Sequence, residues 1–141
     1  SAASGAISLK VAGALALNGS VDASGTIGLR ANSAVMEAGS SMTSSTADIF
    51  LALETNFTMD ASSSLSAPSG DVVIRAGGNL TVATIDAGEL IDLESGADLM
   101  TAGTSANPTS LTSPVLRLFA QDELGTSLYR RELPNTAASR I

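Results

Sequence analysis

A chain of 141 residues, 44% of them hydrophobic, is long enough for one folded domain with a sizeable core. This hydrophobic content argues against disorder, which needs low hydrophobicity together with high net charge. Only 3% of the residues are aromatic and Trp is missing, so the sequence predicts a thin core filled with aliphatic side chains.

The charge and the missing residue types narrow the possible functions. Fourteen acidic and seven basic residues give a net charge of −7, and we expect no nucleic-acid partner because phosphate binding draws on a basic face. The lack of His and Cys excludes Ser-His-Asp and Cys-His relays and the usual zinc sites. We therefore predict no enzyme, no catalytic residue, no metal and no cofactor. No run of about 18 apolar residues occurs, so membrane insertion is not expected.

Short alternating apolar pairs recur along the chain from near its beginning. The first pair is Ile7 and Leu9, and the intervals between successive pairs are 20, 22, 23, 19 and 25 residues. Such period-two alternation predicts β-strands. The six strands predicted in this way begin at Ile7, Ile27, Ile49, Val72, Ile91 and Leu116.

Two further apolar positions follow each pair. In all six repeats, the residue eight positions after the first member of the pair is apolar. These residues are Leu15, Val35, Phe57, Leu80, Leu99 and Leu124. A third apolar position follows at a variable distance, at Val21, Met42, Leu65, Ile85 and Leu111. Each repeat thus contains three short strands, and insertions are expected around the third one because loops absorb them there.

Three short strands per repeat predict an all-β solenoid, the parallel β-helix, in which each strand pairs with its counterpart in the next coil about 4.8 Å away. We expect about six coils of 19–25 residues within residues 1–126, and a C-terminal tail, partial last coil or linker within 127–141. Since the chain begins within the pattern, it is interpreted as a piece of a longer polypeptide. Its N-terminal edge should be open, and should continue into further coils or stack end to end on another subunit.

Three segments carry a resemblance to a known family. They are "GAISLKVAGALAL" at 5–17, "GTIGLRA" at 25–31 and "GDVVIRAGGNLTV" at 70–82. This pattern resembles the large secreted adhesins of the filamentous haemagglutinin type over residues 5 to about 126. The resemblance implies a right-handed parallel β-helix and an extracellular or cell-surface location.

Outward positions of neighbouring coils can be paired from the repeat. Asp92 should meet Arg117, and Arg75 should meet Glu94, as surface ion pairs. Asn56 and Asn79 share an outward position and are expected to form an amide ladder. The inward position of Glu37 is unfavourable for a carboxylate, so we expect a local bulge that turns Glu37 outward and Met36 inward.

Two sets of outward residues are candidates for function. Asp48 and Asp71 occupy the same position in adjacent coils, where two carboxylates could serve a glycosidase or contribute to a Ca²⁺ site; a solvated structural pair is the favoured interpretation. The exposed apolar residues Phe50, Val73 and Phe119 could form a contact surface, or a loop or the C-terminal segment could cover them.

The pattern favours a structural or adhesive solenoid segment of a large secreted or cell-surface protein, which mediates surface attachment or acts as a shaft. Its partner would be a host or matrix surface, presented by protein or glycan. The alternatives are a carbohydrate-active β-helix, which would hydrolyse or bind a polysaccharide, and a self-assembling fibre subunit.

Overall fold

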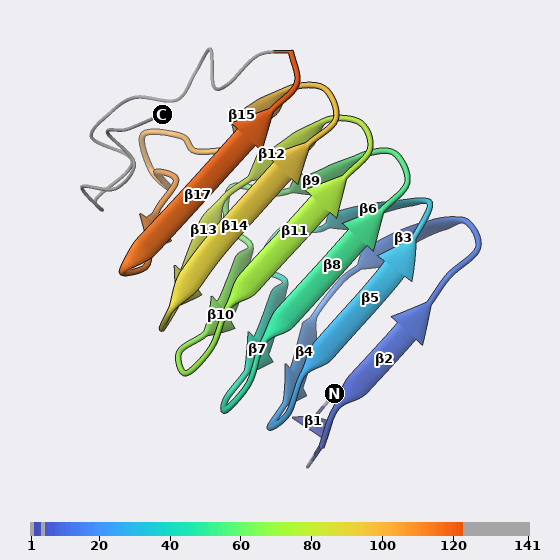
Figure 1. The fold of residues 1–141 in the computed structure, drawn as a ribbon, viewed down its shortest axis with the longest axis vertical. Helices are drawn as coiled ribbons and strands as arrows, with labels where there is room; N and C mark the ends of the chain where they lie inside the picture. The colour runs from blue at the N-terminus through green and yellow to red at the C-terminus, as the bar shows by residue number, and fades with distance from the viewer. Residues whose placement is uncertain (1, 4, 123–141) are drawn as a thin grey trace.

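The computed structural model describes residues 2, 3 and 5–122, which form three parallel β-sheets wound into a solenoid (Figure 1). No helix occurs among these residues. One sheet, called sheet B below, lies in front in Figure 1, and the other two, sheets A and C, lie behind it. The chain advances from coil to coil in a right-handed sense. Sheet B consists of six strands, and the chain completes about five turns. The parallel sheets and the sense of the winding confirm the predicted right-handed parallel β-helix.

Each turn contributes one strand to each sheet. Sheet A contains β1 (Ala2–Ala3), β4 (Ser20–Ala23), β7 (Ser41–Ser44), β10 (Ser64–Ala67), β13 (Thr84–Ala87) and β16 (Leu111–Thr112). Sheet B contains β2 (Ile7–Lys10), β5 (Ile27–Ala31), β8 (Ile49–Leu53), β11 (Val72–Ala76), β14 (Leu90–Ser95) and β17 (Val115–Ala120). Sheet C contains β3 (Ala14–Leu17), β6 (Ser33–Met36), β9 (Phe57–Met59), β12 (Leu80–Val82) and β15 (Leu99–Thr101).

The core consists of aliphatic columns that run along the solenoid. Val72 pairs in parallel register with Ile49 on one side and with Ile91 on the other, as the repeat predicts. All three side chains are fully buried, and burial of each contributes about 1.5–3 kcal/mol. The third apolar position of each repeat is confirmed as well, because its residues form one column of sheet A. These residues are Val21, Met42, Leu65, Ile85 and Leu111.

The second coil departs from the predicted spacing. Its corner between β5 and β6 is one residue shorter than in the neighbouring coils, so Ala34, and not Val35, stacks between Leu15 and Phe57. Val35 is 40% exposed, and its assignment to the core was wrong. The same shift buries Met36 and exposes Glu37. The expected orientation of these two residues is confirmed, although a shortened corner and not a bulge causes it. Leu124 lies outside the described residues.

The corner between sheets B and C leaves little space for side chains. A Cβ atom added to Gly77 would lie 2.2 Å from the carbonyl oxygen of Glu54 in the preceding coil. A Cβ atom added to Gly96 would lie equally close to the carbonyl oxygen of Gly77. Glycine at this corner therefore permits the close stacking of consecutive backbones.

We expect the loop from sheet C to sheet A to tolerate insertions better than the tight corner between sheets B and C. Two residues inserted between Ser105 and Ala106, in the exposed loop that connects β15 of sheet C to β16 of sheet A, should lower the melting temperature by only about 1–3 °C, since loop lengthening costs a few tenths of a kcal/mol. The same insertion between Gly77 and Gly78 should misregister β12 and unfold at least one coil. Equal losses of melting temperature in a thermal unfolding measurement would contradict this expectation.

Candidate functional site

Asp48 and Asp71 lie at the corner that leads into sheet B, one coil apart, as predicted. The backbone N–H of Asp71 donates a hydrogen bond of 2.8 Å to Oδ1 of Asp48. Gly70 leaves room for this carboxylate, because a Cβ atom there would lie 2.4 Å from the same oxygen. Both residues are half-buried. One carboxylate oxygen of the pair is thus committed to holding the next coil, which favours the structural interpretation over a catalytic or Ca²⁺-binding one.

Side chains at the corner between sheets B and C bind the backbone of the following coil in the same way. Oδ1 of Asn56 accepts a hydrogen bond of 2.8 Å from the backbone N–H of Asn79, and Oδ1 of Asn79 accepts one of 3.2 Å from Asp98. The predicted asparagine ladder is therefore present, but it joins side chains to backbone and not amide to amide.

Asp60 anchors the corner that leads into sheet A. Its carboxylate accepts hydrogen bonds from the backbone N–H and from the hydroxyl of Ser62, at 2.9 and 2.7 Å. These two bonds, the backbone one first, lower the pKa of Asp60 below its ordinary value. The Ser62 hydroxyl also accepts a hydrogen bond from Gly39 in the preceding coil. This polar group is thus part of the scaffold between coils.

The outer face of sheet B carries both of the predicted ion pairs. Arg75 lies 3.5 Å from Glu94, and Arg117 lies 3.8 Å from Asp92. A third pair, which the repeat alone does not predict, joins Arg75 to Asp92 at 3.7 Å. Each exposed pair contributes roughly 0–1 kcal/mol, so the three support the register without dominating stability.

The predicted contact residues occupy the same face of sheet B but not one patch. Phe50 is 44% exposed and pairs directly with half-buried Val73. Phe119 is also exposed, but it belongs to the neighbouring outward column, where Glu94 and then Arg75 precede it. Phe50 and Val73 therefore form one small apolar patch on adjacent strands, and Phe119 lies three coils away from Phe50.

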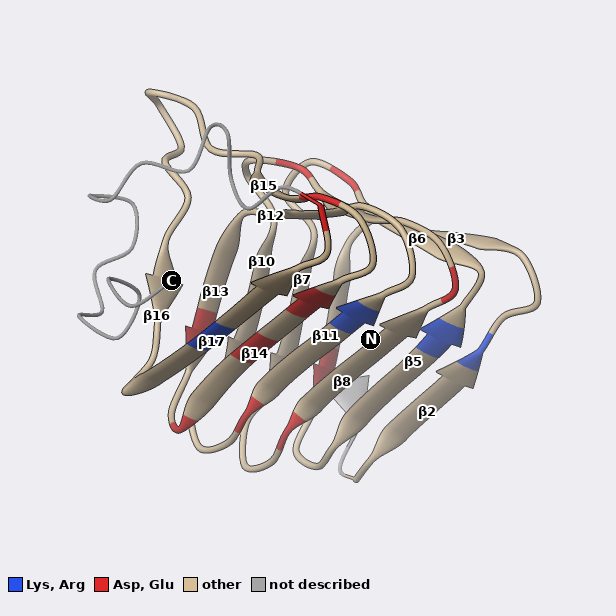
Figure 2. Cartoon of the chain, turned by 45° about the horizontal axis from the view of Figure 1, so that its top comes forward, with Lys and Arg blue, Asp and Glu red and all other residues tan. Residues whose placement is uncertain are grey.

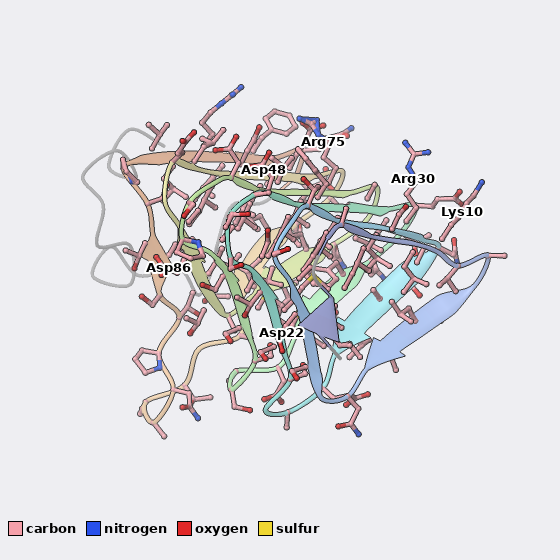
Figure 3. The ribbon with its side chains drawn as sticks, turned by 90° about the horizontal axis from the view of Figure 1, so that it is seen from below. Lys10, Asp22, Arg30, Asp48, Arg75 and Asp86 are labelled. Atoms are coloured by element: carbon pink, nitrogen blue, oxygen red, sulfur yellow. The ribbon has the colours of Figure 1, made fainter. Side chains whose placement is uncertain are left out.

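The outer face of sheet A has a different character. From β4 to β16 its outward positions carry small polar or acidic side chains, and two of them, Asp22 and Asp86, lie on another side of the molecule from Lys10 and Arg30 (Figure 3). The residues stacked there are Ser20, Asp22, Ser41, Thr43, Ser64, Ser66, Thr84, Asp86 and Thr112. Within the described residues, the four basic side chains therefore lie on sheet B, together with most of the exposed large apolar side chains; Val35 on sheet C is the exception.

Sequence reasoning considered the basic residues singly and missed their common position. Lys10, Arg30 and Arg75 all lie three residues after the first member of an apolar pair, and the register places them in one outward column of sheet B. Inspection of this fixed offset would have found them.

Among residues 2, 3 and 5–122, no three Asp or Glu residues lie close enough together to hold a metal ion.

None of the elements in the described part is a helix long and apolar enough to cross a membrane.

Comparison of the chain with models of known protein families, with curated proteins and with solved structures finds no match.

Replacement of Asp48 distinguishes a structural carboxylate from a reactive one. Asp48→Ala should leave the N–H of Asp71 without its acceptor and cost about 1–2 kcal/mol. Asp48→Asn keeps an acceptor oxygen and should cost less than about 0.5 kcal/mol. Chemical denaturation measures both free energies of unfolding.

Asp71→Ala is the matched control, because the structure shows no hydrogen bond to the Asp71 carboxylate within the described residues. A loss of stability in Asp71→Ala as large as that in Asp48→Ala would contradict the assigned role of Asp48.

Proposed function

We propose that this chain is a structural and adhesive solenoid segment of a large secreted or cell-surface protein. The observation that carries the proposal is the unbroken parallel register of sheet B across six strands. Each further coil adds length, and adds two or three outward side chains to sheet B, without changing the core. Such an architecture supplies reach and extended binding surface, as in other solenoid proteins. The exposed Phe50 and Phe119 on one face fit a role in attachment.

A binding array tests the attachment role. The purified chain should bind at least one glycan or extracellular-matrix protein on the array. The double variant Phe50→Ser with Phe119→Ser should weaken this binding about tenfold, because exposed aromatic residues often anchor interfaces. Val35→Ser, which removes an apolar side chain of similar exposure from sheet C, is the matched control and should bind as the unaltered chain does.

The same sample can be incubated with acidic and neutral polysaccharides. Release of reducing ends or unsaturated products that the pair Asp48→Asn with Asp71→Asn abolishes would replace the adhesive proposal by a carbohydrate-active one. Absence of binding across the whole array would contradict the attachment role.

One observation favours self-assembly as a second candidate function. At the N-terminal end, an apolar hollow opens onto the core, lined by Ile7, Leu9, Leu15 and Leu17 among others, and Leu9 is 45% exposed. Within residues 2, 3 and 5–122, strands β1, β2 and β3 each have a partner on one side only. Unpaired strand edges over exposed core residues are suited to receive another layer of strands. This end could therefore stack on a second copy or on a further coil.

Light scattering at increasing protein concentration tests end stacking. The chain should form dimers or longer assemblies, and Leu9→Glu should shift the association to at least about tenfold higher concentration because it buries a charge at the joint. Phe50→Glu introduces the same charge at a position of equal exposure on the flank and should leave the association unchanged. A strictly monomeric chain, or equal effects of the two variants, would exclude stacking through this end.

A further inference from the structure

The positive charges of the described part gather on one face of an otherwise acidic molecule. Its four basic residues project from four strands of sheet B, β2, β5, β11 and β17, shown in blue in Figure 2. Lys10, Arg30 and Arg75 extend from the same side of the solenoid in Figure 3. In a chain with a net charge of −7, this distribution makes the outer face of sheet B the natural contact for an acidic partner.

Two of these cations have no role in the scaffold that the structure reveals. Arg75 and Arg117 lie within 4 Å of carboxylates on β14. Lys10 and Arg30 are direct neighbours in register, and neither side chain forms an ion pair or hydrogen bond within the described residues. Like charges placed directly opposite each other on adjacent strands are destabilising. The Lys10–Arg30 pair therefore weakens the stack slightly, which indicates a function other than stability.

A shallow hollow lies beside this pair. Its volume is about 430 Å³, and its lining includes Lys10, Gly28, Arg30, Phe50, Ala52 and Arg75. Gly28 lies between Ser8 and Phe50 in register, and Ala52 lies between Arg30 and Arg75. These two small residues form the floor between the cations and the exposed ring of Phe50. No Asp or Glu contributes to the lining. The sheet B hollow, as we call it, thus combines two cations that are unpaired in the described part of the chain, Lys10 and Arg30, with the ion-paired Arg75 and an apolar wall.

We propose that the sheet B hollow binds an acidic protein segment that carries an apolar or aromatic side chain between its carboxylates. Guanidinium and ammonium groups form charge-assisted hydrogen bonds with carboxylates, and aromatic and Arg residues are enriched where proteins meet. Phe50 and Val73 offer a contact for an apolar side chain, which a uniform acidic polysaccharide or a nucleic-acid backbone does not supply. This inference rests on the proposed role in attachment and names the class of partner for one of its surfaces.

Fluorescence anisotropy with a synthetic peptide tests the proposal. The probe is the labelled peptide EDELFEDE, and its companion EDEAAEDE has the same charge without the apolar pair. The first should bind with a dissociation constant on the order of 10–100 µM, because the hollow is shallow and open. The second should bind about tenfold more weakly, and the affinity of both should fall as salt is added.

Variants of the chain locate the binding site. Arg30→Glu should weaken binding of EDELFEDE about tenfold or more, because it replaces a charge-assisted hydrogen bond by a repulsion between like charges. Gly28→Leu should weaken it by filling the floor without changing any charge, and a Cβ atom at Gly28 meets no other atom within 4 Å, so the fold should be kept. Arg117→Glu reverses a charge on the same sheet outside the hollow and should leave binding within about twofold.

Three results would overturn the proposal. The first is the absence of peptide binding to the unaltered chain. The second is equal binding of EDELFEDE, EDEAAEDE and a polyuronate, which would reveal a general attraction of anions. The third is an equal loss in Arg30→Glu and Arg117→Glu. If Arg30→Glu still binds on the array while EDELFEDE does not bind to the unaltered chain, the attachment role is supported but the sheet B hollow is not its binding site.

Discussion

The parallel pairing of every described strand with the strand one coil away is the constraint on which the rest of this structure depends. It places each side chain between its counterparts in the adjacent coils, so most inward positions are apolar and neighbouring volumes must match. The buried Ser44 and Ser95 are tolerated because their hydroxyls donate hydrogen bonds to backbone carbonyls. Ala34 lies between Leu15 and Phe57, where a small residue beside a large one keeps the column filled. The pairing also brings consecutive corners together, which explains why the backbone at Gly77 and Gly96 leaves no space for a Cβ atom.

Much of this arrangement follows from the sequence because the constraint repeats. The alternating pairs and their fixed offset place sheet B and most of sheet C, and even the variable third side is found correctly, since Met42 and Leu65 are single apolar residues among Ser and Thr. The error at Val35 has a physical cause. Ala34, Val35 and Met36 are three consecutive apolar residues, so alternation cannot tell which of them face inward, and the length of the preceding corner decides.

The candidate site was less accessible to such reasoning. Register alone pairs Arg75 with Glu94 and Asp92 with Arg117, but the additional contact of Arg75 with Asp92 depends on how long side chains lean across a strand. The function of Asp48 in binding the N–H of Asp71 could not be predicted, because it depends on the local course of the backbone. The sheet B hollow depends on the small size of Gly28 and Ala52 next to larger neighbours, which becomes visible only when adjacent columns are viewed together.

The contrast between two outer faces bears on where function resides. Outward residues are free of the demands of the core, so a solenoid can carry similar small polar side chains in successive coils at little cost, as sheet A does from β4 to β16 with its Ser, Thr and Asp residues. Sheet B instead changes from coil to coil and includes a like-charged neighbouring pair and an exposed aromatic ring. Neither feature adds to the stability of the stack. Because the register would accommodate a uniform polar face equally well, these departures support the proposed contact of sheet B with another molecule.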